Sequence, residues 1–385
     1  MMNPNSKING PTEVFSPNDD AELSAFLADS YARGIPLRIA GGGTRLDLGA
    51  LNAQQTLTSR ALTGIVTYEP GALTLIARAG TPLEEVEQTL AEEGQALAFE
   101  PMDHRGLLGS SGVPTIGGVV AANVSGPRRL QAGACRDHLL GVRFVDGSGR
   151  KIKNGGRVMK NVTGLDLSKL MCGSFGTLGV LTEVALKTLP RAERQLTLVF
   201  SKVSLQEACT IFASALATPY EVSGAVYHQE SAWLRVEGFA QQAAYRADRL
   251  KALFRENQID VIADEESRAL WRDFKNVEVF AQSSEPLWRI LIKPSEAPAL
   301  ARSLQLLGGD VFIDWGGGLV WYCGSAQSAE VRSAASAGRA VLIRQGARPA
   351  SDRFPEDAGA ISRLSAALRK TFDPAGILNP KLMGD

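Results

Sequence analysis

The segment AGGGTRL, residues 40–46, places three consecutive glycines behind a short apolar strand and follows them with a hydroxyl group and a cation. Successive glycines can alternate their backbone conformations so that several N–H groups point into one concavity, which binds an anion such as a phosphate. A threonine hydroxyl and an arginine guanidinium next to this concavity would add further donors. These residue types predict an anion-binding loop formed by Gly41, Gly42, Gly43, Thr44 and Arg45.

Two common nucleotide-binding loops do not match this segment. A P-loop requires a lysine after its last glycine, and none follows here; a dinucleotide fingerprint requires a glycine where Leu46 stands. The next stretch, LDLGALNAQQT, has no helical period, so no helix N-terminus follows to receive a phosphate. A tight turn without a ligand remains the simplest alternative at this position.

Further glycine-rich loops occur in the same half of the chain. PTIGG (114–118), NVSG (123–126) and GSFGTLGV (173–180) are each flanked by apolar segments that would hold them rigidly. One long ligand that passes through several rigid loops would explain them together. FAD is such a ligand, because its adenine, pyrophosphate, ribityl chain and flavin extend across a fold and need mainly backbone donors and space.

Composition and charge exclude several other classes of protein. Lys plus Arg and Asp plus Glu are both 41, so the formal net charge is zero and no overall field attracts nucleic acid or an anionic membrane. The cysteines lie far apart without a CxxC pair, which argues against zinc, an iron–sulfur cluster or a disulfide framework. The N-terminus does not resemble a signal peptide, and no stretch has the ~18 apolar residues of a membrane span. We therefore expect a cytoplasmic protein without a metal site or direct membrane insertion.

In the first half of the chain, the capping and ending residues predict a helix over residues 16–34, with Ser16 as its N-cap and Gly34 at its end. A second helix should begin at a capping box of Thr81 and Glu84. Two strands separated by a Pro-Gly turn precede it, and a hairpin is expected over residues 141–153.

After Pro190 the pattern changes to two β-α-β-β-α-like runs, typical of an antiparallel sheet with helices on one face. An amphipathic helix before an Asp-Pro turn ends the chain. We expect an α+β protein with three parts: residues 1–190, an α+β cap or substrate domain over residues 191–350, and a segment over residues 351–385 that returns to the first domain.

Five ordered motifs carry a resemblance to a known family: AGGGTRL, PTIGG…AANVSG, GVRFVDGSGR, GRVMKNVTGLDLSKLMCGSFGTLGV and FDPAGILNP. In this order they resemble the FAD-binding flavoproteins of the vanillyl-alcohol oxidase and p-cresol methylhydroxylase (PCMH) type. The run SGPRRLQAGACRDHLLGVRFVDGSG is most similar to FAD-binding subunits of glycolate oxidases. The resemblance implies a two-part FAD-binding domain of the PCMH type with an antiparallel-sheet-plus-helices cap.

The resemblance also implies which residues contact FAD. The glycine loop would hold the pyrophosphate, the second block would follow the flavin and its linker, residues 135–137 would line the cofactor path, and the last loop would pack near the adenine. The implied residues are Gly41, Gly42, Gly43, Thr44, Arg45, Thr115, Gly117, Gly118, Asn123, Ser125, Gly126, Arg136, Asp137, Gly176, Gly179 and Val180.

Three departures from the family pattern affect the expected chemistry. Relatives that bond FAD covalently place a histidine in the glycine loop, and none stands there, so FAD should be non-covalent. The 2-hydroxy-acid dehydrogenases of the family carry closely spaced late histidines that bind metal and substrate, whereas His228 stands alone. The GLDLSKL helix, which follows Lys160 and Asn161, has Leu165 where the family has tyrosine.

Oxidation of a 2-hydroxy acid requires a base for the hydroxyl proton and a cation for the carboxylate. His228 and His104 are the candidate bases, and Arg289 and Arg235 on expected strands are candidate carboxylate ligands. Arg128 and Arg129 adjoin the proposed flavin loops. Each of these residues also has an ordinary structural interpretation, such as a hydrogen-bonded histidine or an arginine on a solvated face.

The resemblance implies the FAD-binding subunit of a glycolate or other small 2-hydroxy-acid oxidase or dehydrogenase. Its expected partners are a paralogous flavin subunit and an iron–sulfur subunit, and these partners could attach it peripherally to the inner membrane. Two alternatives remain open: an assembly or electron-relay subunit with structural FAD, and a stand-alone FAD-dependent alcohol oxidase.

Overall fold

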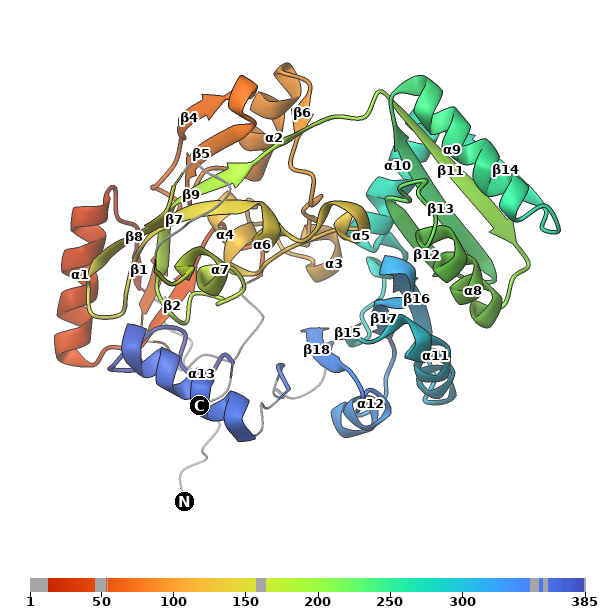
Figure 1. The fold of residues 1–385 in the computed structure, drawn as a ribbon. Coiled ribbons are helices and arrows are strands. Elements are labelled where there is room, and N and C mark those ends of the chain that lie inside the picture. The colour runs from red at the N-terminus through yellow and green to blue at the C-terminus, as the bar shows by residue number, and fades with distance from the viewer. Residues whose placement is uncertain are drawn as a thin grey trace.

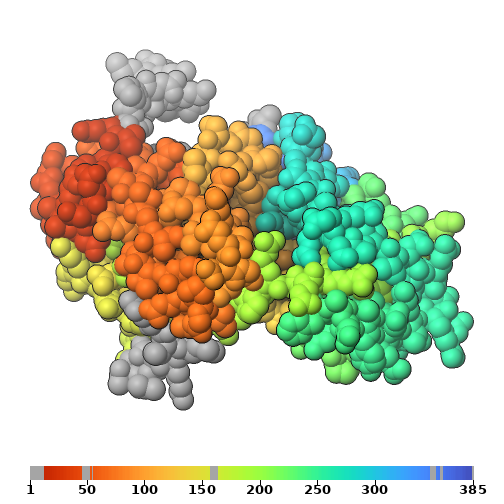
Figure 2. Space-filling view, turned by 90° about the horizontal axis from the view of Figure 1, so that it is seen from above, coloured from red at the N-terminus to blue at the C-terminus, as the bar shows by residue number. Residues whose placement is uncertain are grey.

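The structure is a computed structural model, and it describes residues 13–45, 53, 55–156, 164–346, 353–355 and 359–383. Lys160 and Asn161, which the family pattern singles out, lie outside the described residues. Two lobes lie side by side, one red to yellow and the other green to blue (Figure 2).

A three-stranded parallel sheet in the order β1-β3-β2 opens the first lobe. Helix α1 packs on it through Leu23 and Leu27. The helix ends at Gly34 as predicted, with φ 63°, but its N-cap is Asp19 and not Ser16, because the Asp19 carboxylate accepts the N–H groups of Ala21 and Glu22 at 2.7 and 2.9 Å. The elements are β1 (Glu13–Phe15), α1 (Asp20–Arg33), β2 (Leu37–Ala40) and β3 (Gln55–Thr58).

A five-stranded antiparallel sheet in the order β4-β5-β9-β7-β8 forms the rest of the first lobe's framework (Figure 1). The predicted Pro-Gly turn joins β4 to β5, and the predicted hairpin joins β7 to β8. The bounds are β4 (Ile65–Glu69), η2 (Pro70–Ala72), β5 (Thr74–Arg78), β7 (Leu139–Val145), β8 (Lys151–Gly155) and β9 (Val180–Lys187).

Short helices connect these strands and carry the loops of interest. The predicted capping box at α2 is wrong: Pro82 is the N-cap, and the Thr81 hydroxyl donates to the Arg78 carbonyl at 2.7 Å. A two-stranded pair, β6 with β10, closes this lobe. The elements are α2 (Leu83–Glu92), β6 (Gln95–Ala96), α3 (Arg105–Leu108), α4 (Ile116–Ala121), α5 (Arg129–Ala132), α6 (Cys135–His138), α7 (Leu167–Met171) and β10 (Leu189–Pro190).

The second lobe is built on an eight-stranded antiparallel sheet, in the order β14-β11-β13-β12-β16-β17-β15-β18. The strands are β11 (Arg194–Ser201), β12 (Gly224–His228), β13 (Ser231–Gly238), β14 (Ile259–Ala263), β15 (Leu287–Leu291), β16 (Asp310–Asp314), β17 (Leu319–Cys323) and β18 (Arg339–Arg344).

The two faces of this sheet differ in what covers them. Side chains such as Leu234 and Tyr322 pack against four helices on the outer face. Contrary to the expectation of helices on one face, α10 covers the inner face, where the Trp271 indole N–H donates to the Thr197 hydroxyl at 2.8 Å. The helices are α8 (Leu205–Leu216), α9 (Ala240–Leu253), α10 (Asp264–Asn276), α11 (Ala297–Leu306) and α12 (Ser328–Ala334), with single turns η3 (Glu278–Phe280), η4 (Pro294–Glu296) and η5 (Trp315–Gly317).

The inner face shares its hydrophobic core with the first lobe. Phe312 and Trp321 of the sheet belong to the same buried cluster as Phe99 and Phe144. Because side chains alternate between faces, Arg235, Arg289 and Asp314 also lie on this inner face. The eight-stranded sheet therefore presents charged side chains toward the first lobe. The α+β fold class is confirmed.

The chain ends beside β2 of the first lobe. After α13 (Gly359–Phe372), the Leu37 N–H donates to the Ile377 carbonyl at 2.8 Å, and the Asn379 N–H donates to the Leu37 carbonyl at 2.9 Å. Helix α13 lies below the first lobe in Figure 1. Within the described part of the chain, no helix is both long and apolar enough to traverse a bilayer.

Candidate functional site

One cleft brings together three of the four glycine-rich loops that the sequence singled out, whereas the fourth, NVSG (123–126), does not line it. It contains about 1130 Å³ of space between protein atoms, part of it open to solvent. The loop after β2, the N-terminus of α4 and the loop before β9 form its walls. Eleven of the predicted cofactor residues line it: Gly41, Gly42, Gly43, Thr44, Arg45, Thr115, Gly117, Gly118, Gly176, Gly179 and Val180.

Close packing between loops explains why two of the glycines have no side chain. A Cβ at Gly42 would lie 1.4 Å from the Val113 carbonyl oxygen, and one at Gly117 would lie 2.6 Å from Ala79 Cβ. The Val113 N–H donates to the Gly42 carbonyl at 2.9 Å, which fixes the two loops against each other. The glycines therefore allow separate segments to meet along one narrow cleft.

Three carbonyls of the glycine loop accept hydrogen bonds from other segments, and N–H groups of the loop are left available. The Gly41 carbonyl accepts the Thr58 hydroxyl at 2.9 Å, and the Thr44 carbonyl accepts the Ser110 hydroxyl at 3.0 Å. The N–H groups of Gly42, Gly43 and Thr44 have no acceptor among the described residues. Free amides beside the Arg45 guanidinium fit a dianionic pyrophosphate.

Cations gather where the cleft meets the second lobe. Arg45 and His104 line the cleft, and Arg289 is close enough to lower the pKa of both. Burial, with a contribution from Arg289, lowers the pKa of Arg45 to about 10. Burial and the two arginines hold the pKa of His104 well below its usual range, so its imidazole is neutral at neutral pH. This end of the cleft is positively charged and favours an anionic ligand.

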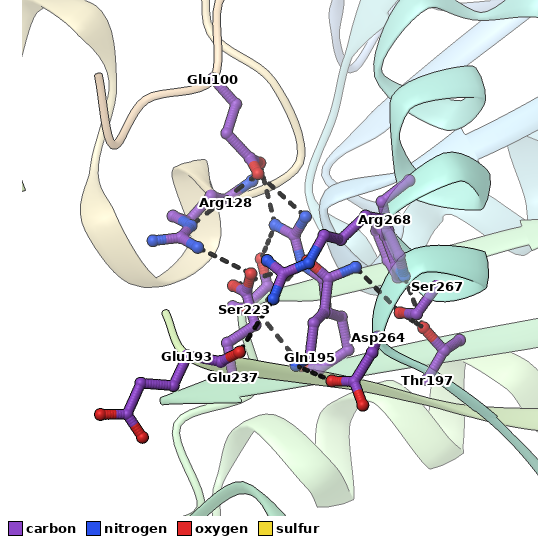
Figure 3. A network of polar contacts seen from close by, with 12 residues as sticks. Glu100, Arg128, Glu193, Gln195, Thr197, Ser223, Glu237, Asp264, Ser267 and Arg268 are labelled. Atoms are coloured by element: carbon purple, nitrogen blue, oxygen red, sulfur yellow. Dashed lines mark hydrogen bonds and ion pairs between the residues drawn. The ribbon is translucent and has the colours of Figure 1, made fainter. Parts of the chain in front are cut away.

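A buried ion-pair network joins the two lobes beside this region (Figure 3). Arg235 of β13 donates two hydrogen bonds to the Glu100 carboxylate, at 2.9 and 2.8 Å. Arg128 donates to Glu237 at 2.7 Å through its side chain and to Glu100 at 2.8 Å through its backbone N–H. Burial would raise the pKa of Glu100, but Arg235 and Arg128 outweigh it and lower that pKa to about 2. The Glu100 carboxyl is therefore ionised at neutral pH.

Comparisons with known proteins agree with this geometry. Residues 11–155 match the FAD_binding_4 family, whose description is FAD binding domain. Glycolate oxidase subunit GlcE of Escherichia coli (strain K12) is 36% identical over 357 residues, which are 90% of this chain and 92% of GlcE. The chain belongs to the FAD-binding family that includes GlcE. It is a FAD-binding oxidoreductase of the PCMH type.

Other relatives of this FAD-binding family match a smaller part of the chain. D-lactate dehydrogenase of Archaeoglobus fulgidus is 30% identical over 51% of this chain and 42% of its own length. Glycolate oxidase subunit GlcD of Bacillus subtilis (strain 168) is 27% identical over 60% of this chain and 48% of its own length. The chain therefore spans less than half of these two relatives. Two solved structures of alkyldihydroxyacetonephosphate synthase share the fold, with TM-scores of 0.67 and 0.69 at 14% identity, covering 95% and 96% of this chain and 76% of each of theirs.

Five predicted residues of the FAD-binding family pattern do not line the cleft. Asn123 and Ser125 accept the backbone N–H groups of Arg136 and Cys135 at 3.1 and 2.9 Å, so they hold the 135–137 segment in place. The Arg136 and Asp137 side chains are half exposed. The carbonyl of the fifth residue, Gly126, accepts the Trp315 indole N–H at 3.0 Å. Cofactor contacts by these five residues stay a prediction.

The candidate catalytic residues are separated in the structure. His228 does not line the cleft; its Nε2 lies 2.9 Å from an Asp310 carboxylate oxygen, and its ring contacts Phe312. Arg128 belongs to the ion-pair network. Arg289 does not line the cleft, but its charge acts on Arg45 and His104, which do. No group of three or more potential metal ligands occurs among the described residues.

Sequence reasoning missed one residue of the FAD-binding site that joins distant segments. Asn379 lines the cleft, accepts the Ile39 N–H at 2.8 Å and donates to the Phe175 carbonyl at 2.8 Å. It therefore connects the strand before the glycine loop with the third loop. The motif FDPAGILNP was part of the family resemblance, but nothing in its composition indicates a contact with residues more than 200 positions away.

Proposed function

We propose that this chain is the FAD-binding subunit of an oxidase or dehydrogenase complex for glycolate or a related small 2-hydroxy acid. The observation that carries the proposal is 36% identity to GlcE over 90% of the chain. The positively charged end of the cleft supports it, because the substrate of such an enzyme is a carboxylate. Within the complex the chain takes electrons from the substrate and passes them on.

FAD lies in the cleft without a covalent bond in this proposal. The glycine loop holds the pyrophosphate through the free N–H groups of Gly42, Gly43 and Thr44 and through the charge of Arg45. No histidine stands in that loop to form a bond to the flavin. When bound, the flavin accepts the substrate hydrogen as a hydride equivalent.

We assign acceptance of the hydroxyl proton to His104. Of the two histidines predicted as bases, His104 lines the cleft and His228 does not. Its neutral imidazole has a free lone pair for the proton. Arg45 and Arg289 stabilise the negative charge of an alkoxide or carboxylate next to it.

A partner chain would receive the electrons in this proposal. The cysteines of the chain are free, and none of them forms part of a cluster of metal ligands among the described residues. An iron–sulfur subunit supplies the next carrier, and a paralogous flavin subunit completes the complex. The name of GlcE, a glycolate oxidase subunit, supports a complex of several chains.

One observation favours a second candidate function, in which the chain is an assembly or relay subunit with structural FAD. His228, the late histidine, is engaged by Asp310 outside the cleft, and no cluster of metal ligands accompanies it in the described part of the chain. A paralogous subunit would then bind the substrate.

Anaerobic titration separates the two functions. The chain is purified alone and together with proteins that co-purify from its host, and glycolate or lactate is added while the flavin spectrum is recorded. Bleaching of the isolated chain supports substrate oxidation by this subunit. Bleaching only in the complex supports the relay function, and absence of flavin in every preparation would overturn both.

A further inference from the structure

Two arginines from different lobes share one tryptophan ring. The guanidinium carbon of Arg129, on α5, lies 4.4 Å from the centroid of Trp315, and that of Arg289, on β15, lies 5.1 Å from it. Both distances are within the range of cation–π contacts. We call Arg129, Arg289 and Trp315 the arginine–tryptophan cluster.

The tryptophan of this cluster is held rigidly. Its indole N–H donates to the Gly126 carbonyl at 3.0 Å, and its backbone N–H donates to Asp314 Oδ1 at 2.6 Å. Trp315 is 6% exposed. A fixed ring that contacts both guanidinium groups limits their motion, so little further ordering is needed when they bind a ligand.

Among the residues that the structure describes, no carboxylate forms an ion pair with either arginine of the cluster. Arg235 and Arg128 on the same side of the sheet are each paired with Glu100 and Glu237. By contrast, Arg129 and Arg289 have no side-chain hydrogen bond or salt bridge to any residue that the structure describes, although both are half-buried. Buried charges in proteins are normally paired, so unpaired guanidinium groups indicate a missing anion.

Two acids act on the charges of the cluster, Asp314 on Arg289 and Asp137 on Arg129. Asp314 is the acid next to Arg289, and burial raises the pKa of its carboxyl to about 7. Arg289 in turn lowers the pKa of Arg45 and of His104, both of which line the FAD-binding cleft. Arg129, Arg289 and Trp315 do not themselves line the cleft, but the charge of Arg289 acts on two residues that do.

We propose that Arg129 and Arg289, held by Trp315, bind the carboxylate of the small hydroxy acid. The assignment rests on the proposed function for the identity of the substrate, and on the geometry of the cluster for the anion site. Guanidinium groups match a carboxylate through paired N–H donors, and two of them from opposite lobes enclose it. Trp315 is a positioning residue that aligns both groups.

Binding of a carboxylate that cannot be oxidised tests this site independently of turnover. Oxalate is titrated into the FAD-loaded protein, and its Kd is measured from the change in the flavin absorbance spectrum and by calorimetry. We expect R289M and R129M each to weaken oxalate binding by at least ~10-fold, because each removes a charge-assisted hydrogen bond. R302M, which removes an exposed arginine of α11, is the matched control and should leave Kd unchanged.

Conservative variants separate the anion site from folding and cofactor binding. R289K keeps the charge but loses the paired donors, and W315F keeps a ring but loses the bond to Gly126; both should keep FAD and weaken oxalate several-fold. Unchanged Kd in R289M and R129M with full FAD content would overturn the site. If R289M loses FAD, the test depends on R289K instead. An unchanged Kd for oxalate in R289K would also overturn the proposed carboxylate site.

The same titration shows whether the site prefers a carboxylate or a phosphate. It also separates failure of the anion site from failure of the proposed function. Inorganic phosphate in place of oxalate should bind more weakly, and tighter binding of phosphate would overturn the carboxylate assignment. Arginine-dependent oxalate binding without bleaching by glycolate would leave the anion site standing and would remove the proposed oxidation by this chain.

Discussion

The Arg235 guanidinium of the eight-stranded sheet and the Glu100 carboxylate of the first lobe form a two-pronged ion pair, with N–O distances of 2.9 and 2.8 Å. Arg235 is only 2% exposed, and Glu237 lies within 3.4 Å of it on the same strand. The pair thus connects the lobes through charges that have little access to water. The effect of such a buried ion pair on stability is seen when one partner is removed, because the other charge is then left buried without compensation.

We expect R235M to destabilise the protein by about 3–5 kcal/mol, because Glu100 and Glu237 lose the buried guanidinium that contacts both of them and keep only Arg128 as a cation. Unfolding in urea, followed by tryptophan fluorescence, measures the change. The double variant E100Q/R235M should recover much of the loss, since the uncompensated charge at Glu100 is removed. A loss below 1 kcal/mol in R235M would contradict the buried ion pair.

The acid limb of the stability profile provides a second test of the same pair. The pKa of Glu100 is about 2 in the folded protein and lies near its ordinary value of 4.5 in the unfolded chain. Its stabilising contribution is therefore complete above pH 4.5 and is lost as the pH falls toward 2. The unfolding free energy of E100Q should change less steeply than that of the wild type across this window.

The close approach at Gly42 predicts a selective loss of FAD. A Cβ there would lie 1.4 Å from the Val113 carbonyl oxygen, so G42A must separate the two loops that line the cleft. We expect less than about a tenth of the wild-type flavin per chain after purification and a lower melting temperature. G71A, at a glycine with open space around its Cβ position, should retain full flavin content.

Periodicity and turn chemistry predicted most of the strands and hairpins, because those signals are local. The Pro-Gly turn before β5 and the β7–β8 hairpin follow from neighbouring residues alone. The N-cap of α1 moved from Ser16 to Asp19, since both are good capping residues and a choice over three positions depends on tertiary packing. The Thr81 hydroxyl donates to the Arg78 carbonyl of its own loop and does not accept an N–H group of the helix it was expected to cap.

In the site, too, local sequence signals predicted some residues, whereas contacts between distant positions could not be predicted. The glycine loops were visible in the sequence because unusual composition marks them. The Arg129–Trp315–Arg289 contact could not be predicted from the sequence. It joins positions that are far apart in the chain and become neighbours only through the order of the strands in the sheet. Arg235 and Arg289 looked equivalent as strand arginines, and only the position of Glu100 shows that one is paired.

Replacement of the two candidate histidines should give opposite results. H104Q keeps a polar side chain in the cleft but removes the proton acceptor, so we expect flavin reduction by glycolate to slow by about 100-fold or more. In H228Q the flavin should be reduced by glycolate at a rate within about twofold of the wild-type rate, because His228 is bound to Asp310 outside the cleft. Stopped-flow absorbance of the anaerobic flavin measures both rates. A slow H228Q with a normal H104Q would reverse the assignment of the base.

The ionisation of Asp314 predicts how carboxylate binding depends on pH. Burial raises the pKa of this carboxyl to about 7 against the combined pull of the Trp315 N–H, Arg235 and Arg289, and Glu100 adds to the increase. Below pH 7 Asp314 is mainly neutral and Arg289 is unopposed; as the pH rises through 7, the new negative charge next to Arg289 competes with a bound anion.

The affinity for oxalate, which stays fully ionised across this range, should therefore fall on the order of tenfold between pH 6 and pH 8. D314N keeps an oxygen that can accept the Trp315 N–H but cannot ionise, so its affinity should be high and independent of pH. The Kd is measured by flavin absorbance at constant ionic strength, with R302M as the control. If wild-type Kd rises as the pH is lowered from 8 to 6, Asp314 does not oppose the anion, and the arrangement of charges around Arg289 differs from the one described.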